Sequence, residues 1–355
     1  MQMAHDHSNS DKPLGVGLIG AGPVTQAIHL PTIATLSDRL KVVHVMDVDE
    51  LLAATVAKRA GARASTDIGA VLEDPEVDVV AVCSPDRFHA DQVIAACEAG
   101  KRAVLCEKPL ATSLEDAARI AAASRQHGVP VIVGTMHRYD RAVDAALASW
   151  EAGGEAAELI RSVLYLPPND LFVSAATELA AEPAALAIPA QPWSREDQAE
   201  IVRMCILGLA IHDIPLLRLL LPRFDEVADI RFLQPLGYVI TLVAGTRSAQ
   251  FIALTPGDWP LRWTLDAFSP SSTLRIDFTP SFVLAGSARA EIRKAGSSTV
   301  WELPRNGYQE EWLHLSEVAH GITSPIVGIE EAVDDLTYAL ELADRSAAHL
   351  LAGIP

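Results

Sequence analysis

The chain has 355 residues, half of them apolar, and its formal net charge at pH 7 is −18. A composition this apolar excludes an intrinsically disordered protein. No cluster of lysines and arginines interrupts the acidic balance, which excludes a nucleic-acid-binding face, and the length allows two domains with separate cores.

The first 12 residues are polar and lack the apolar stretch of a signal peptide, so we expect a flexible, solvated tail. The most apolar part of the chain, residues 204–221, contains the ionisable residues His212, Asp213 and Arg218. It is therefore predicted to be a buried helix rather than a membrane span, and we expect no membrane partner.

The cysteines do not have the spacing of a zinc-binding set, and no other pattern of metal ligands is visible in the sequence. Two of them lie in apolar runs, where cysteine behaves as a small hydrophobic residue. We expect free thiols in a reducing cytoplasm and no metal site. The cysteines are Cys83, Cys97, Cys106 and Cys205.

From residue 13 to residue 137, short apolar runs alternate with longer segments of helical pattern. The runs are rich in valine and nearly continuous, which is typical of strands covered on both faces. The alternation predicts a doubly wound parallel sheet, the Rossmann arrangement. The expected strands are 16–19, 42–46, 77–83, 103–106 and 131–134, and the expected helices include 49–59, 90–99 and 114–126.

Two overlapping glycine patterns compete for the loop after the first strand. The pattern that begins at Gly15 is a complete G-x-G-x-x-G, but the residues before it are polar and include a proline. A loop that begins at Gly20 follows an apolar run and opens a helix at Pro23. We therefore predict that Gly20 and Gly22 form the phosphate-binding loop. Thr25 stands where a third glycine is usual and implies a slightly wider spacing of helix and strand.

Asp47 ends the second expected strand, 25 residues after Gly22. A carboxylate at this point accepts hydrogen bonds from the ribose hydroxyls of a dinucleotide. The next residues, 48–50, bring no positive charge, so a 2′-phosphate would be repelled. The sequence therefore predicts NAD as the cofactor, in preference to NADP.

Residues 138–355 are predicted to form a second, substrate-binding domain. A strand is expected at 159–166 and a long loop or lid at 167–198. Closely spaced strands from 227 to 301 predict a mainly antiparallel sheet, and an apolar stripe from Ile329 to Leu350 predicts a final helix. The expected fold class is α/β: an N-terminal Rossmann sheet and a C-terminal α/β domain with an open sheet.

Three further stretches carry a resemblance to a known family. Ser84-Pro85 and His89 follow the expected strand 77–83, Glu107-Lys108-Pro109 follows the expected strand 103–106, and the apolar helix contains His212-Asp213. With the glycine loop, His29-Leu30-Pro31 and the segment 136–140, they make nearly the whole chain similar to the Gfo/Idh/MocA oxidoreductases, which include glucose–fructose oxidoreductase and inositol 2-dehydrogenase. The resemblance implies a sugar or polyol substrate and an open sheet that forms homodimers or homotetramers.

The resemblance also implies roles for individual residues. Lys108 and His212 are expected to flank the nicotinamide and to act catalytically on the reacting oxygen. A histidine can take the hydroxyl proton as hydride leaves the alcohol carbon, and a lysine ammonium can stabilise the developing charge. The expected cofactor-binding residues are Gly20, Gly22, Pro23, Val24, Asp47, Ser84, Pro85, His89, Glu107 and Lys108.

Three residues are expected to contact the substrate: Arg138, Trp193 and Asp213. Arg138 has an ion pair with Asp140 as its alternative, and Trp193 either stacks on a sugar ring or anchors the lid. Family members commonly have an aspartate one helical turn before the histidine, where this chain has Gly208. On a continuous helix, Asp213 would point elsewhere, so it would substitute poorly for that aspartate.

The leading hypothesis is an NAD-dependent enzyme that oxidises a secondary alcohol of a sugar, inositol or related cyclic polyol. A second hypothesis is an enzyme that uses tightly held NAD transiently, to eliminate or hydrolyse a bond. A third is a regulatory protein that keeps the nucleotide site without its chemistry, which the glycine at position 208 suggests. Product formed without net NADH would support the second hypothesis, and hydride transfer with any substrate would exclude the third.

Overall fold

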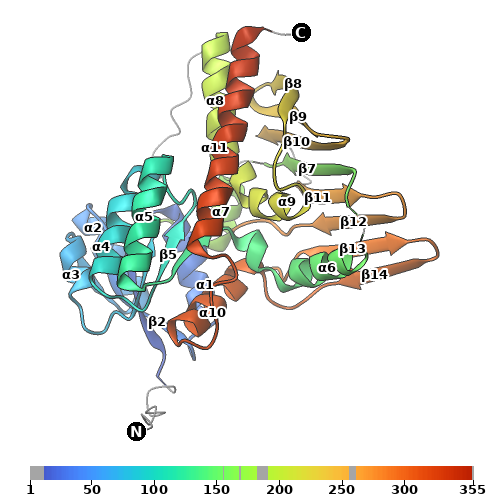
Figure 1. Ribbon diagram of the computed structural model, residues 1–355. Helices are drawn as coiled ribbons and strands as arrows, with labels where there is room; N and C mark the ends of the chain where they lie inside the picture. The colour runs from blue at the N-terminus through green and yellow to red at the C-terminus, as the bar shows by residue number, and fades with distance from the viewer. Residues whose placement is uncertain (1–11, 155, 168, 182–190, 256–260, 354–355) are drawn as a thin grey trace. The chain divides into compact units, whose positions relative to one another are not determined.

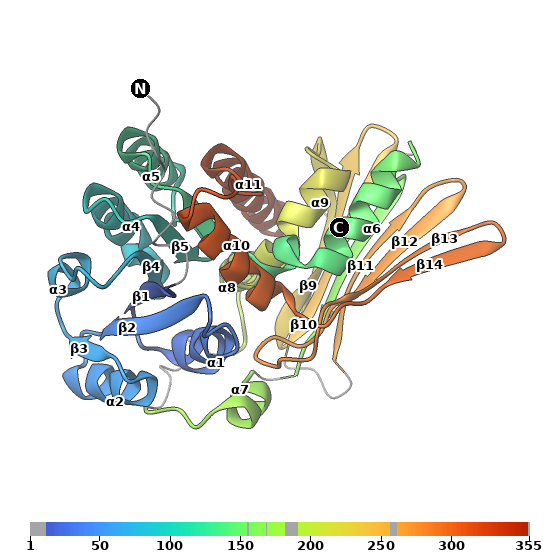
Figure 2. The same cartoon turned by 90° about the horizontal axis from the view of Figure 1, so that it is seen from below.

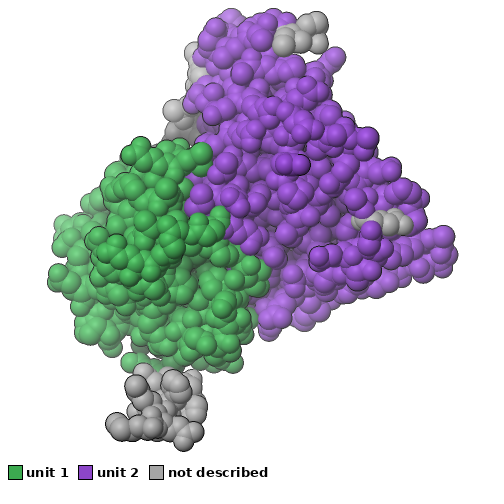
Figure 3. Space-filling view, viewed as in Figure 1, with its two compact units in different colours: residues 1–134, 311–330 green, residues 135–310, 331–355 purple. Residues whose placement is uncertain are grey.

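The computed structural model describes residues 12–154, 156–167, 169–181, 191–255 and 261–353 (Figure 1). Residues 1–11 of the expected tail and residues 182–190 of the expected lid lie outside this set. The chain forms two compact units, residues 1–134 with 311–330, and residues 135–310 with 331–355 (Figure 3). The first unit therefore contains a return segment, residues 311–330. The sequence prediction divides the chain at residue 137 and so includes this segment in the second domain.

The first unit is built on a six-stranded parallel sheet in the order β3-β2-β1-β4-β5-β6. This order, with the chain moving outwards in both directions from β1, is that of a doubly wound Rossmann sheet and confirms the predicted class. Its apolar runs are buried as expected, because helices cover both faces. The strands are β1 (Leu14–Ile19), β2 (Leu40–Met46), β3 (Arg63–Ser65), β4 (Val79–Val82), β5 (Ala103–Glu107) and β6 (Val131–Gly134).

Side-chain caps begin two helices of the first unit. Asp49 caps α2 (Glu50–Ala60), and Ser113 caps α5 (Leu114–His127) by accepting a hydrogen bond from the backbone N–H of Asp116. Helices α1 and α2 lie on one face of the sheet, and α4 and α5 on the other (Figure 2). The remaining helices are α1 (Leu30–Ala34), α3 (Ile68–Leu72) and α4 (His89–Glu98).

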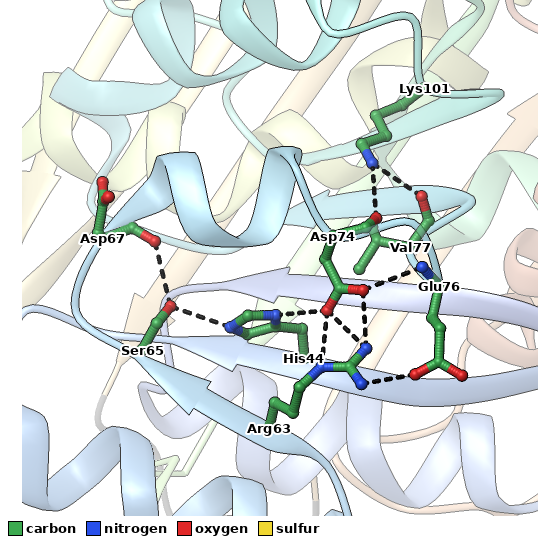
Figure 4. Close-up of polar contacts among 8 residues, drawn as sticks. All are labelled: His44, Arg63, Ser65, Asp67, Asp74, Glu76, Val77 and Lys101. Atoms are coloured by element: carbon green, nitrogen blue, oxygen red, sulfur yellow. Dashed lines mark hydrogen bonds and ion pairs between the residues drawn. The ribbon is translucent and has the colours of Figure 1, made fainter.

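A buried carboxylate fixes the edge of this sheet (Figure 4). Asp74 accepts hydrogen bonds from His44 Nδ1 at 2.8 Å and from Nε and Nη2 of Arg63, both at 2.8 Å. His44 lies on β2 and Arg63 on β3, so one side chain joins two strands to the loop before β4. Strand β3 has only three residues, and these bonds hold it where its own short ladder is weak.

The second unit is built on an eight-stranded, mainly antiparallel sheet in the order β14-β13-β12-β11-β7-β10-β9-β8, as predicted. Among the described strands of this sheet, only β7 and β10 pair in parallel. Helix α6 packs against β12–β14 and α8 against β9. The strands are β7 (Leu159–Tyr165), β8 (Glu226–Leu233), β9 (Leu236–Ala244), β10 (Arg247–Thr255), β11 (Arg262–Phe268), β12 (Ser272–Asp277), β13 (Arg289–Lys294) and β14 (Ser297–Trp301).

The helices of this part of the chain differ from the sequence prediction in two places. The segment expected as a loop or lid contains α7 (Asp170–Ala176), and its last residues already belong to α8 (Arg195–Gly208). The apolar stretch 204–221 is not one helix, because α8 ends at Gly208 and α9 (Ile214–Leu220) begins six residues later. The other helices are α6 (Arg141–Ala152), α10 (Gly307–Ala319) and α11 (Ile329–Ala352).

Within the described residues, no helix is both long and apolar enough to cross a bilayer.

Candidate active site

The loop after β1 has the geometry of a phosphate-binding loop. Gly15 lies inside β1, so the loop begins at Gly20, as the second glycine pattern requires. Gly20 has a φ of +99°, and a Cβ there would lie 2.7 Å from the backbone of Cys83, so only glycine fits. A Cβ at Gly22 would meet no atom within 4 Å. The first glycine therefore serves packing, and the second leaves open space beside the N-terminal end of the helix, where phosphate oxygens bind.

Thr25, in the place of the third glycine, ties the helix to this loop. Its fully buried Oγ1 donates a hydrogen bond to the carbonyl oxygen of Gly20 at 2.6 Å. The helix has a π turn over Thr25–His29 before α1 continues it. The hydroxyl thus adds a contact that glycine could not make, beyond the change of spacing expected from sequence.

Asp47 stands at the end of β2 and holds the other side of the loop. Its Oδ2 accepts a hydrogen bond from the backbone N–H of Ala21 at 2.8 Å, and its Oδ1 accepts one from that of Asp49 at 3.0 Å. Each carboxylate oxygen has a second lone pair, so Asp47 keeps acceptor capacity for ribose hydroxyls. The neighbouring Val48, Asp49 and Glu50 are exposed and bring no positive charge.

The ends of β4 and β5 are joined by a buried histidine. His89 Nδ1 lies 2.8 Å from the carbonyl oxygen of Pro109, and its Nε2 lies 2.9 Å from that of Ser84. Ser84 Oγ donates to Gln92 Oε1 at 2.6 Å. This histidine holds the Ser84-Pro85 turn against the Lys108-Pro109 turn, at the carboxyl edge where ligands of doubly wound sheets bind.

Glu107 and Lys108 lie at that edge, at the end of β5. Glu107 Oε1 accepts a hydrogen bond from His29 Nε2 at 3.1 Å. Trp312 Nε1, which can only donate, bonds His29 Nδ1 at 3.1 Å and so fixes this tautomer. Glu107 Oε2 accepts from the backbone N–H of Lys108 at 3.1 Å. Glu107 thus holds the main chain of Lys108 in place.

In Lys108 and in Glu107, burial and the charges of neighbouring groups shift the pKa in opposite directions. Burial lowers the pKa of the half-buried Lys108 below its usual value, although the charges of Glu107 and Asp86 oppose the shift. Burial opposes ionisation of Glu107, but the hydrogen bond from His29 and the charge of Lys108 hold its pKa below its usual value. A lysine whose ammonium is destabilised by burial is suited to stabilise negative charge on a nearby oxygen.

Glu311, on the return segment of the first unit, lies fully buried beside this pair. Neither of its carboxylate oxygens hydrogen-bonds another described residue. Burial, and then the charge of Glu107, raise its pKa well above the ordinary value. No sequence signal pointed to Glu311 or Trp312, because they lie about 200 residues or more from their neighbours in this cluster.

One other arrangement contains the residue types of a nucleophilic triad. Ser65 Oγ lies 3.1 Å from His44 Nε2, and His44 Nδ1 lies 2.8 Å from Asp74 Oδ2. However, Ser65 Oγ donates to the carbonyl oxygen of Asp67 at 3.1 Å, which uses the hydrogen that a nucleophile would give to His44. With Arg63 also on Asp74, this network holds the sheet edge rather than a substrate.

In the second unit, His212 lies in a short 3₁₀ turn, Ala210–His212, between α8 and α9. The expected continuous helix is wrong here, because Pro215 near the start of α9 has no N–H for the carbonyl of Ile211 and its ring clashes with that carbonyl. Gly208 therefore does not lie one helical turn before His212. The signal for the break, Pro215, was present in the sequence.

Asp213, the next residue, is fully buried and is bonded by three side chains. It accepts hydrogen bonds from Ser162 Oγ at 2.6 Å, from His137 Nδ1 at 2.9 Å and from Trp263 Nε1 at 2.9 Å. These donors come from β7, from the segment before α6 and from β11. Asp213 thus organises the interior of the unit, and its expected contact with a substrate stays a prediction.

Aromatic rings enclose the two histidines of this region. The ring of His137 stacks on Phe278, with centroids 3.7 Å apart and planes 9° apart. Trp263 meets His137 edge-on, with centroids 4.5 Å apart. The His212 ring lies 6.1 Å from that of His137 and 5.6 Å from that of Trp263. No motif or spacing in the sequence assigns a role to His137 or Phe278.

The other two expected substrate residues have partners within the second unit. Arg138 Nη1 lies 3.6 Å from Asp144, while Asp140 caps α6 through the backbone N–H of Ala142. The ion pair of Arg138 is thus not with Asp140. Trp193, just before α8, is half-buried and meets Phe232 of β8 edge-on, with ring centroids 5.4 Å apart.

Comparisons with known proteins agree with this architecture. A family model described as an oxidoreductase family with an NAD-binding Rossmann fold, GFO_IDH_MocA, matches residues 14–135. An inositol 2-dehydrogenase from Acidothermus cellulolyticus is 32% identical over 237 residues, which cover 64% of this chain and 69% of that protein. Inositol 2-dehydrogenase 3 from Saccharopolyspora erythraea is 34% identical over 192 residues, 53% of this chain and 56% of that protein. The match to the latter thus spans little more than half of its length.

Solved structures share the fold over nearly the whole chain. A UDP-N-acetylglucosamine 3-dehydrogenase from Acidithiobacillus ferrooxidans has a TM-score of 0.69 at 19% identity and covers 95% of this chain and 99% of its own. A 3-ketoreductase from Actinomadura kijaniata, in complex with NADP and TDP-benzene, has a TM-score of 0.67 at 19% identity, covering 94% and 96% of the two chains. At these identities the likeness concerns the fold.

Proposed function

Because this chain belongs to the Gfo/Idh/MocA family of oxidoreductases, we propose that it is an NAD-dependent dehydrogenase acting on a secondary alcohol of a sugar, inositol or related cyclic polyol. One observation carries the proposal. An open glycine loop, Asp47 and the half-buried Lys108 all lie at the carboxyl edge of the first sheet. Relatives named inositol 2-dehydrogenase support the substrate class.

The residues of the first unit fit a dinucleotide. Gly22 leaves room for a pyrophosphate, Pro23 and Val24 open the helix that follows it, and Asp47 keeps lone pairs for ribose hydroxyls. Ser84, Pro85 and His89 follow β4, and Glu107 and Lys108 end β5, so both groups would border the nicotinamide end. When bound, NAD would supply the hydride acceptor.

We further propose that NAD is preferred over NADP. Asp47 is followed by the exposed acidic residues Asp49 and Glu50, which would repel a 2′-phosphate. Since the Actinomadura relative was solved with NADP, family membership alone does not decide this point.

Lys108 and His212 would act at the reacting oxygen. The Lys108 ammonium would stabilise the negative charge that develops as the hydroxyl proton leaves, and a histidine of the second unit, His212 in the first instance, would take that proton. Arg138, Trp193 and Asp213 remain our proposed substrate contacts. We also expect a cytoplasmic protein that forms a homodimer or homotetramer. Light scattering on the purified protein would measure the mass of the oligomer.

The first test is calorimetric titration with NADH and NADPH after bound nucleotide has been removed, followed by an alcohol panel with myo-inositol and D-glucose. We expect tighter binding of NADH and net formation of NADH with an alcohol. Product formation without net NADH would instead support transient use of the cofactor. If neither NADH nor NADPH bound, the result would contradict the proposal.

The second test replaces Lys108. We expect Lys108→Met to lower kcat by about 10²–10⁴-fold, the range for a positioned acid–base or charge-stabilising group, while the variant still binds NADH. Because burial lowers the pKa of Lys108, the ammonium is lost below the usual lysine range, and wild-type kcat should fall on the alkaline side. Full turnover in the variant would refute this role.

A further inference from the structure

A carboxylate–imidazole pair stands beside His212 in the second unit. His137 Nδ1 lies 2.9 Å from Asp213 Oδ1, and both side chains are buried. We propose that His137, oriented by Asp213, is a second proton-accepting residue of the alcohol site, working beside His212. This inference rests on the function proposed above and adds a residue to its chemistry.

Asp213 fixes which nitrogen of His137 is available. Ser162 and Trp263 already donate to the carboxylate, so Asp213 acts as an acceptor throughout, and the His137 nitrogen that faces it carries the hydrogen. The other nitrogen, Nε2, then presents its lone pair. Among the described residues, none hydrogen-bonds that nitrogen. A carboxylate behind an imidazole also stabilises the imidazolium that forms when Nε2 takes a proton.

The ring of His137 is held by packing as well as by this bond. Phe278 stacks on one face at 3.7 Å, and the edge contact with Trp263 limits rotation about the side chain. A base held in one orientation by neighbours and by a hydrogen bond is what proton transfer requires, because misplacement of the reacting atoms lowers the rate steeply.

His212 is the imidazole next to this pair. The two imidazole centroids are 6.1 Å apart, so both rings can contact one small substrate. Gly208 brings no carboxylate to His212, and Asp213 serves His137 instead. The titratable groups around His137, within the described residues, are Asp213, His212 and Asp140.

The proposed step balances with the cofactor of the proposed function. In the oxidising direction, the hydroxyl O–H bond breaks and its proton passes to His137 Nε2. The electron pair of the carbinol C–H bond leaves with its hydrogen, as hydride, to oxidised NAD. The alcohol becomes a ketone, and Asp213 keeps its negative charge throughout. The proton then returns to solvent.

The test compares His137→Asn with Phe278→Leu. The asparagine amide keeps a donor towards Asp213 and lacks the basic Nε2, whereas the leucine removes only the stacked ring. The substrate is the alcohol of the panel that gives the fastest NADH formation. We expect kcat of His137→Asn to fall by about 10²-fold or more. We also expect a change in the acidic limb of its pH profile, which is the fall of kcat as the pH is lowered. Phe278→Leu should keep the wild-type pH profile.

Chemical rescue separates a proton acceptor from a structural residue. In His137→Ala, added imidazole should restore part of kcat in a saturable way, and 4-methylimidazole should shift the pH dependence according to its own basicity. NADH binding and the melting temperature confirm that each variant is folded. Should the alanine variant not fold, His137→Gln replaces it in the pH measurements.

The outcomes distinguish this inference from the proposed function. A wild-type kcat and pH profile in His137→Asn, with activity lost in His212→Asn, would overturn the role of His137 and leave the dehydrogenase intact. A lowered kcat in His137→Ala that imidazole does not restore, together with an unchanged fall of kcat at acidic pH, would also overturn it. If no alcohol yields NADH in the wild type, the proposed function fails first and this inference fails with it.

Discussion

The two loop glycines differ at the scale of single atoms, although the motif treats them alike. Gly20 is required by its backbone conformation and by the nearby Cys83 main chain, whereas Gly22 has open space around it. We expect Gly20→Ala to destabilise the protein by about 1–3 kcal/mol, because alanine is strained at that φ. Gly22→Ala should leave stability unchanged and weaken NADH binding.

Urea unfolding of both variants, and calorimetry with NADH, would measure the difference. Equal stability losses in the two variants would show that the loop is not divided into a packing glycine and a binding glycine.

Glu311 gives the molecule a pH dependence that can be derived from its burial. Its pKa is raised in the folded state, so above the ordinary carboxyl range the unfolded chain releases a proton that the folded chain retains. Stability therefore falls as pH rises through the window above the unfolded pKa. In Glu311→Gln this loss is absent, and we expect the variant to gain stability relative to wild type as pH rises.

The measurement is urea unfolding of both proteins at a series of pH values from 4 to 8. A constant difference between them would contradict a protonated Glu311 in the folded state. Glu310→Gln is the matched control, since Glu310 is already bonded by Arg305 and Arg141.

At this scale, the sequence predicted the residues that lie next to a strand end and missed those that meet through the fold. Gly20, Asp47 and Lys108 could be placed because each follows an apolar run. The His29–Trp312 bond joins residues 283 positions apart, and the bond between His137 and Asp213 spans 76 positions. No local spacing encodes such pairs.

Among the elements, the helix after the glycine loop offers a test of whether the missing glycine is a defect. Thr25→Gly would complete the G-x-G-x-x-G pattern at this loop. It would also remove the hydrogen bond to Gly20 and place a glycine inside a helix. We expect a loss of about 1–2 kcal/mol in stability and no gain in NADH affinity.

Thr25→Ser keeps the hydroxyl and serves as the control, with most of the stability retained. Tighter NADH binding by Thr25→Gly, measured by calorimetry, would mean that the threonine holds the helix too far from the nucleotide.

The elements themselves were predictable where one physical signal dominated. Continuous valine runs indicated the buried strands, and the helical pattern of 114–126 matches α5 (Leu114–His127). The short β3 was missed because three residues carry no pattern. The break between α8 and α9 differs from the expectation because Pro215 interrupts the helix, although the composition of 204–221 is apolar throughout.

For the whole molecule, the division into two units predicts where a nucleotide acts. At a free NADH concentration of 100 Kd, binding stabilises the native state by about 2.7 kcal/mol. We expect the resulting protection from hydrogen exchange to concentrate in residues 14–30, 46–50, 83–89 and 104–110, at the carboxyl edge of the first sheet. Mass spectrometry with and without NADH would measure it, and protection confined to β8–β14 would contradict the proposed site.

The return segment also has a consequence for how this protein is made. Trp312 packs against His29, and Arg102 donates to the carbonyl oxygen of Ala319, so the first unit is complete only with residues 311–330. During synthesis, the ribosome must add all of residues 135–310 before that segment exists, which takes about 10–35 s at 5–20 residues per second. Throughout that interval the nascent first unit lacks the partners of His29 and Arg102. The surface that residues 311–330 later cover stays accessible to chaperones.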